Sequence, residues 1–261
     1  MINIFSPEDA KNFYKYIDMP TKREVRGTRE YVVRTHSGAL LISFHWLDDS
    51  SIVLFANEER CSLMTANELI ADRARDIDDE EGNGLHELFA FFLALTATDT
   101  IELQQLEDRV EDLEDQLFVD GKPNKDGNEL LVECRKEILR KKRYYEEMEL
   151  LSDELADLDH SFKFIDKKFD RLYDFILRTQ ESVEQVREAY QAEIDIEQND
   201  TMKILTVATT IFLPLQLITG WFGMNLLMPE FHWTHGYLFV ICLTLVVVVA
   251  EILFFRYKKW F

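Results

Sequence analysis

The chain has 261 residues, a formal net charge of −20 and three cysteines. This length suffices for one soluble domain and a short membrane region. Residues 201–261 carry a net charge of +2, which leaves −22 for residues 1–200. Because an acidic body repels phosphates, the charge argues against nucleic acid as a partner.

The cysteines and the N-terminus indicate the compartment. Cys61, Cys134 and Cys242 are isolated in the sequence, which argues against a disulfide framework or a thiolate zinc site and fits a reducing compartment. The first residues, MINIFSPEDAKNFYK, lack a basic start and an apolar run. We therefore expect no signal peptide.

Residues 1–85 have the pattern of a small α/β domain. Ser6 is a candidate cap for a short helix, and Thr65 is a candidate cap for a helix that runs through Glu68 and Asp72. Runs rich in β-branched and aromatic residues predict strands at 29–36, 39–46 and 51–55. The domain has no Gly-rich phosphate loop, nucleophile elbow or paired catalytic set, so we do not expect an enzyme.

Residues 86–200 have helical periodicity and predict a coiled-coil stalk. One apolar seam, with spacings of three and four, consists of Leu103, Leu106, Val110, Leu113 and Leu117. A turn is expected at 120–127, and helix resumes at Glu129 with a break near Leu158 to His160. From about Asp159 one helix is expected to run into the membrane over roughly 95 Å, at ~1.5 Å per residue.

Two apolar runs, 201–225 and 236–255, are candidate membrane spans. The first has no charged residue from Ile204 to Phe222, and the second has only Glu251. Each is long enough for a bilayer core of ~30 Å. Residues 226–235 would be the outer loop and 256–261 a basic tail. The basic tail places the C-terminus in the cytoplasm, and two spans then place the N-terminal body on the same side.

Polar, small and apolar residues of the first span recur at helical spacing and form one stripe. The stripe consists of Met202, Leu205, Thr206, Thr209, Leu213, Gln216 and Gly220. In a symmetric oligomer each position, together with Asn199 before the span, becomes a ring around a pore, while the Val- and Leu-rich second span faces lipid. The alternative is that Thr, Gln and Gly only help helices to pack.

Gly223, Met224 and Asn225 close the first span, and Met228, Pro229 and Glu230 follow. With the MKILT start, Pro214 and the RYKKW tail, this region closely resembles the CorA family of divalent-cation channels. The resemblance implies a funnel-shaped homopentamer in the cell inner membrane, which takes up Mg²⁺ with Co²⁺ and Ni²⁺ as further candidates and needs no organic cofactor. Gly223, Met224 and Asn225 would form the outer mouth, and Glu230 would attract cations.

Some residues depart from the family pattern. Phe222 stands where Tyr is common, and Gln216 stands where a small hydroxyl residue is common, which leaves conductance and selectivity open. His232 and His235 could bind Zn²⁺ or Ni²⁺, or lie neutral beside a membrane-belt Trp.

Acidic residues before the membrane offer further candidate sites. Glu188 and Asp195 are seven apart and could form a carboxylate ring, although a solvated helix face explains them equally well. The family resemblance implies closure by Mg²⁺ held between cytoplasmic carboxylates. By rough location only, the candidates for this role are Asp72, Asp76, Asp159, Asp166 and Asp170.

The sequence thus predicts an α+β membrane protein whose partners are the lipid bilayer, divalent cations and copies of itself. Two other functions stay open: a Zn²⁺ transporter on the same fold, and a non-conducting scaffold or sensor. Zinc transporters of this fold usually have GIN rather than the GMN found here, which argues against the first.

Overall fold

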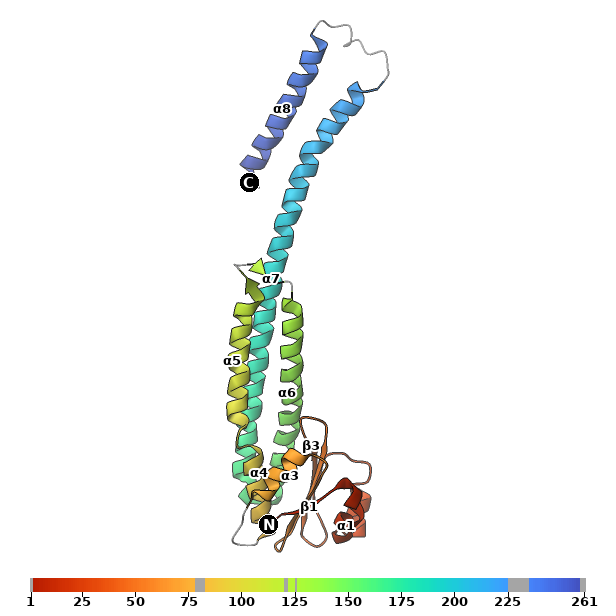
Figure 1. The fold of residues 1–261 in the computed structure, drawn as a ribbon, viewed down its shortest axis with the longest axis vertical. Coiled ribbons are helices and arrows are strands. Elements are labelled where there is room, and N and C mark those ends of the chain that lie inside the picture. Colours follow the sequence, from red (N-terminus) through yellow and green to blue (C-terminus); the bar gives the residue numbers. More distant parts are fainter. Residues whose placement is uncertain (1, 78–82, 120–121, 125, 225–234, 259–261) are drawn as a thin grey trace. The chain divides into compact units, whose positions relative to one another are not determined.

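The computed structural model describes residues 2–77, 83–119, 122–124, 126–224 and 235–258 (Figure 1). Contacts divide the chain into two units, Met1–Glu188 and Ala189–Phe261, which are described separately.

The first unit contains a five-stranded mixed sheet with the strand order β1-β5-β4-β3-β2. β1 pairs with β5 in parallel, and all other neighbours are antiparallel. The strands are β1 (Asn3–Phe5), β2 (Tyr31–Arg34), β3 (Leu40–His45), β4 (Ser51–Ala56) and β5 (Cys61–Thr65). The three expected strands are therefore confirmed as β2, β3 and β4, while β1 and β5 were not predicted.

Both faces of the sheet are covered, which explains why its strands are almost continuously apolar. Leu40, Ile42 and Phe44 belong to the main core, whereas Leu41 points into a smaller core with Phe13. The smaller core lies under short helices that follow Ser6, whose side chain accepts a hydrogen bond from the Glu8 amide. These helices are η1 (Pro7–Asp9), α1 (Ala10–Phe13), η2 (Tyr14–Tyr16) and α2 (Met19–Glu24).

Helices α3 (Glu68–Arg75) and α4 (Gly84–Leu95) cover the other face of the sheet (Figure 1). The prediction that Thr65 caps α3 is wrong, because pairing with β4 draws Thr65 into β5. The N-cap is Asn67, whose side chain accepts a hydrogen bond from the Ile70 amide.

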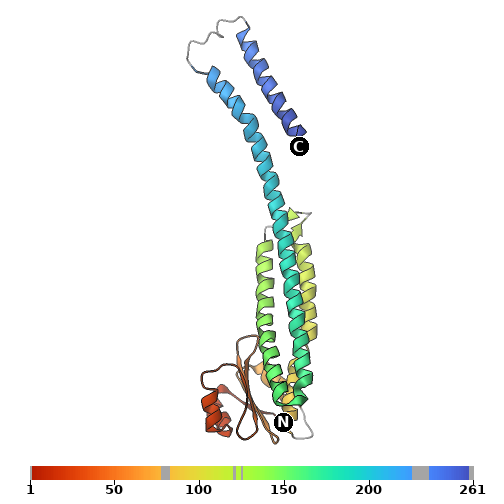
Figure 2. The ribbon, with the colours of Figure 1, turned by 180° about the vertical axis from the view of Figure 1, so that it is seen from behind.

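The remaining helices of the first unit form the predicted stalk. They are α5 (Asp99–Leu117), α6 (Gly127–Leu158), η3 (His160–Phe162) and the first part of α7 (Lys163–Phe222). The expected turn contains a short hairpin, β6 (Phe118–Val119) with β7 (Lys122–Pro123). All five seam residues of α5 are buried, and both views show α5 and α6 alongside α7 (Figures 1 and 2).

The expected break between the last two stalk helices is confirmed. Asp159 has extended backbone angles, with φ −147° and ψ 114°, and therefore ends α6. Its carboxylate accepts hydrogen bonds from the Ser161 amide (3.0 Å) and hydroxyl (2.7 Å). The chain then reverses, and α7 continues without interruption to Phe222, within the first apolar run.

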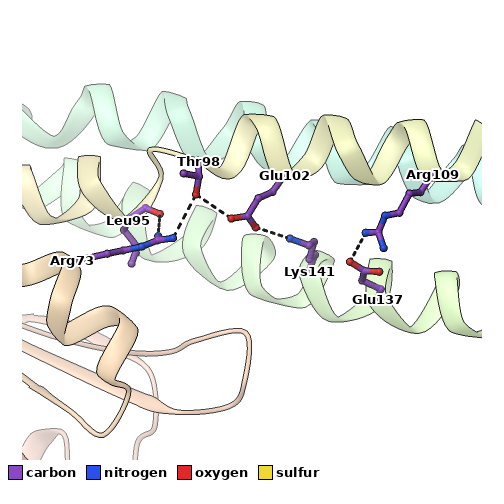
Figure 3. A network of polar contacts seen from close by, with 7 residues as sticks. All are labelled: Arg73, Leu95, Thr98, Glu102, Arg109, Glu137 and Lys141. Carbon is purple, nitrogen blue, oxygen red and sulfur yellow. Dashed lines mark hydrogen bonds and ion pairs between the residues drawn. The ribbon is translucent and has the colours of Figure 1, made fainter.

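A polar network joins α3, α5 and α6 (Figure 3). Arg73 donates to the Leu95 carbonyl at 2.9 Å, and the Glu102 carboxylate accepts from Thr98 at 3.0 Å and from Lys141 at 3.1 Å. Lys141 is only 8% exposed, so the Glu102 carboxylate compensates the cost of burying its ammonium group. Burial alone would raise the pKa of Glu102, but its bonds with Lys141 and Thr98 lower it overall.

Candidate membrane pore and cytoplasmic acidic sites

The second unit contains the end of α7 and the whole of α8 (Gly236–Tyr257). Both helices are long and apolar enough to cross a membrane, and most of their residues in this region are exposed in the single chain. Leu213 is 67% exposed and Tyr237 is 84% exposed. Such surfaces need lipid or neighbouring helices to cover them.

Threonine hydroxyls in α7 donate hydrogen bonds back into the helix. Thr206 donates to the Met202 carbonyl at 2.7 Å, and Thr209 donates to the Leu205 carbonyl at 2.8 Å. Thr219 does the same with Leu215 at 2.9 Å. Because the hydroxyl proton is used internally, the oxygen presents its remaining acceptor capacity to the outside. These side chains therefore offer neutral oxygen to a cation.

The helix geometry places the predicted pore residues on one side of α7. At about 100° per residue, Met202 to Gly220 of the stripe fall within an arc of roughly 100°. Pro214 lies inside this helix and has no amide proton, so it cannot donate to the Thr210 carbonyl one turn earlier. Asn199 precedes the stripe and is exposed, as are Leu205 and Gln216.

The predicted mouth lies only partly within the described residues. The Gly223 amide donates to the Thr219 carbonyl at 2.9 Å, and the Met224 amide donates to the Trp221 carbonyl at 3.3 Å. A Cβ at position 223 would lie 2.9 Å from the Thr219 oxygen, so a larger residue there would force the helix end to shift. Asn225, Glu230 and His232 lie outside the described residues, whereas His235 is exposed next to the start of α8.

The two predicted stalk-ring residues are both exposed. Asp195 accepts a hydrogen bond at 3.3 Å from Gln191, one turn earlier. Glu188 lies at the last position of the first unit and Asp195 lies in the second.

The predicted regulatory acids fall into two groups. Asp72 pairs with Arg75 on its own helix, Asp76 ends α3, and Asp159 caps η3. The backbone hydrogen bond from Ser161 lowers the pKa of Asp159. The carboxylates of Asp72 and Asp159 therefore have local structural roles, whereas Asp76 ends the helix through its backbone amide.

Asp166 and Asp170 have a different environment. Burial raises the pKa of Asp166, and the nearby charges of Asp170 and Asp153 raise it further. The same holds for Glu149, where burial acts first and Asp170 and Asp153 add to it. The structure thus brings acids of α6 and α7 together, and we call Glu149, Asp153, Asp166 and Asp170 the acidic cluster.

Two members of the acidic cluster, Glu149 and Asp153, were not predicted from the sequence. Each helix contributes a pair of acids spaced by four residues, which places both acids of a pair on one face. That spacing is a usable signal once α6 and α7 are known to be antiparallel neighbours. The remaining predicted acids are not joined to this cluster by any contact between described residues.

A mixed-sheet domain, a helical stalk and two C-terminal apolar helices, the first continuous with the stalk, define a two-span membrane protein. A family model described as "CorA-like Mg2+ transporter protein" matches residues 11–259. The chain therefore belongs to the CorA family, as the sequence resemblance predicted.

Individual relatives agree with this assignment. The magnesium transport protein CorA of Wolinella succinogenes is 36% identical over 114 residues, which cover 42% of this chain and 36% of the relative. The cobalt/magnesium transport protein CorA of Thermotoga maritima is 27% identical over 186 residues, which cover 66% of this chain and 52% of the relative. The chain thus matches about half or less of the length of these relatives.

The fold is also that of a solved relative. The structure of the CorA magnesium transporter from Methanocaldococcus jannaschii superposes with a TM-score of 0.72 and covers 99% of this chain and 90% of that one. The sequence identity in this comparison is 20%, so the likeness establishes the fold alone.

Proposed function

We propose that this chain forms a homopentameric channel that admits Mg²⁺ into the cell, with Co²⁺ and Ni²⁺ as further candidates. Membership of the CorA family supports transport of a divalent cation. The chain is not expected to catalyse a reaction or to need an organic cofactor. Five-fold symmetry comes from the family resemblance, while the exposed apolar surfaces of α7 and α8 support assembly in a membrane.

One observation carries the proposal: an apolar helix exposes neutral oxygens along one stripe. Mg²⁺ gives up its water reluctantly, and such oxygens can bind the hydrated ion through that water. Copies of α7 around an axis would turn the stripe into successive rings, from Asn199 on the inside to Asn225 at the mouth. Met202, Leu205 and Leu213 would form apolar rings, which can close by excluding water.

The proposed orientation places the sheet domain and the basic tail in the cytoplasm of the cell. Arg256 lies in the last turn of α8, as the positive-inside rule requires for a cytoplasmic end. Glu188 and Asp195 would then collect cations on the inner side, and Gly223, Met224, Asn225 and Glu230 would do so on the outer side.

We assign regulation by cytoplasmic Mg²⁺ to the acidic cluster rather than to all the predicted acids. Asp166 and Asp170 lie among other carboxylates, and a dication would relieve their repulsion. Asp72, Asp76 and Asp159 remain candidates, but the local contacts of the Asp72 and Asp159 carboxylates compete with a metal ion.

Flux into liposomes that contain the purified full chain tests the proposal. Mg²⁺ influx should be abolished by Asn225→Ala and strongly reduced by Thr209→Val, which removes a stripe oxygen. The matched control is Thr244→Val in α8, whose hydroxyl makes the same type of bond, to Val240 at 2.8 Å. An equal loss of Mg²⁺ influx in the Thr209→Val and Thr244→Val variants would contradict the assignment of α7 to the pore.

The same assay separates the alternatives. Influx of Zn²⁺ without Mg²⁺ would favour a zinc transporter and direct attention to His232 and His235. An intact oligomer that passes no ion would favour a scaffold or sensor.

A further inference from the structure

Three side chains with metal-binding atoms meet where the sheet packs on α6. Glu30 precedes β2, His45 ends β3 and Glu147 lies on α6. The His45 Nδ1 atom lies 3.4 Å from Glu30 Oε1 and 3.7 Å from Glu147 Oε1. One ligand atom from each of the three residues can be chosen so that all lie within 4.8 Å of one another.

These spacings fit a tetrahedral metal ion. Zn²⁺ bonds to nitrogen and oxygen are about 2.1 Å long, which places neighbouring ligands about 3.4 Å apart around a tetrahedron. Both distances from His45 are already close to that value. The distance between the Glu30 and Glu147 carboxylate oxygens can shorten to this value, because the Glu30 side chain is 53% exposed and can change rotamer.

The more buried ligands are held in place by the fold. Glu147 Oε1 accepts a hydrogen bond from the His45 backbone amide at 2.8 Å, which fixes the carboxylate next to the imidazole. The side chains of His45 and Glu147 are only 17% and 15% exposed. A carboxylate oxygen has two lone pairs, so this bond leaves one for a metal ion.

The carboxylates of Glu30 and Glu147 both lie within 3.7 Å of the His45 imidazole, so they repel each other across it. A dication bound to the carboxylates would remove this repulsion.

Basic residues are also close and must be weighed. Lys22, Arg26 and Arg29 line, together with His45, a cavity of about 460 Å³ on one side of the sheet. The positive charge of these three residues disfavours a cation that is attracted only by long-range electrostatics. Binding therefore requires direct coordination, which selects an ion that accepts imidazole nitrogen and excludes Mg²⁺, which prefers oxygen.

We propose that Glu30, His45 and Glu147 bind a first-row transition-metal dication of the Zn²⁺ or Co²⁺ type, with water at the fourth position. The ion would join the sheet to α6 within one chain. This site does not depend on the proposed transport activity, because all three residues lie in the first unit.

The test uses Co²⁺ as the probe, added to the metal-stripped full chain in detergent with excess Mg²⁺. Tetrahedral Co²⁺ absorbs visible light much more strongly than the hydrated octahedral ion, so a hydrated ion in a pore would not mimic the signal. We expect an intense band that saturates at one Co²⁺ per chain. Zn²⁺ should remove the band by competition.

Single substitutions identify the ligands. Loss of an outer hydrogen-bonding partner of a metal ligand typically weakens binding about 10- to 100-fold, so loss of a ligand should cost at least about tenfold. His45→Gln, Glu147→Gln and Glu30→Gln should each have this effect. Glu147→Gln retains an acceptor for the His45 amide, and Glu30→Gln changes an exposed side chain, so neither threatens folding.

The matched control is His36→Gln, because His36 Nδ1 lies 3.3 Å from the Asp18 carboxylate in a simple pair. This variant should bind Co²⁺ like the wild type. An absent band in the wild type would overturn the proposal and leave His45 as a polar contact of two carboxylates. A band that survives both Glu30→Gln and His45→Gln would also overturn it.

Discussion

Asp99 should make the first unit less stable as pH rises, and Asp99→Asn should remove this dependence. Asp99 begins α5 and is only 4% exposed. Burial raises its pKa from 3.8 to about 6, although a hydrogen bond with Tyr145 acts in the opposite direction. No described residue donates a hydrogen bond to its Oδ2 atom.

The sign and size follow from proton linkage. The unfolded chain loses the Asp99 proton near pH 3.8, whereas the folded protein keeps it to about pH 6. Between these values the folded state binds more protons, so its stability falls as pH rises. A shift of about two pKa units corresponds to about 3 kcal/mol, which is fully lost above about pH 7.

Urea unfolding of the full chain in detergent measures this effect. Trp46 is the single tryptophan of residues 1–188, and the centroid of its ring lies 5.0 Å from that of Tyr144. The part of the fluorescence change that comes from Trp46 therefore reports on this core. Asp99→Asn should gain up to about 3 kcal/mol relative to the wild type between pH 4 and pH 7.5. Subtracting the wild-type free energy of unfolding from that of the variant cancels the contribution of the titratable groups that both proteins share.

The control is Asp112→Asn, which removes the charge of an exposed acid on the same helix and leaves the buried site at Asp99 intact. A flat difference for Asp99→Asn would show that Asp99 ionises normally in the folded protein. A difference that falls with pH would show that its pKa is lowered instead, and either result refutes the reasoning.

Three further outcomes can be measured by the same unfolding assay. Gly84→Ala should destabilise the first unit by about 1–3 kcal/mol, because the added Cβ would clash with the Arg60 backbone. An unchanged unfolding midpoint would show that α4 shifts freely. Glu102→Ala should cost more than Lys141→Met, since it leaves a buried ammonium unpaired; the opposite order would refute the dependence of Lys141 on Glu102. Asp170→Asn should reduce the stabilisation by added Mg²⁺, and an equal Mg²⁺ response would remove the acidic cluster from the regulatory proposal.

Short-range patterns in the sequence were sufficient to predict the helical stalk and the two apolar spans. The seam from Leu103 to Leu117 is buried as its spacing predicted, because a helix repeats its faces every three to four residues. The break at Asp159 and the two apolar spans follow from composition and length in the same way. The CorA resemblance likewise came from local motifs: Gly223 to Asn225 at the end of the first span, followed by Met228 to Glu230.

Contacts between distant segments were decided only by the tertiary structure. Thr65 was the predicted cap of α3, and only pairing with β4 makes it part of a strand and leaves the cap to Asn67. The acidic cluster needs α6 and α7 to pack as neighbours before its carboxylates affect one another. His45 and Glu147 are 102 residues apart, yet one hydrogen bond joins them. No periodic pattern in the sequence predicts this contact, because the contact depends on how the sheet packs against the stalk.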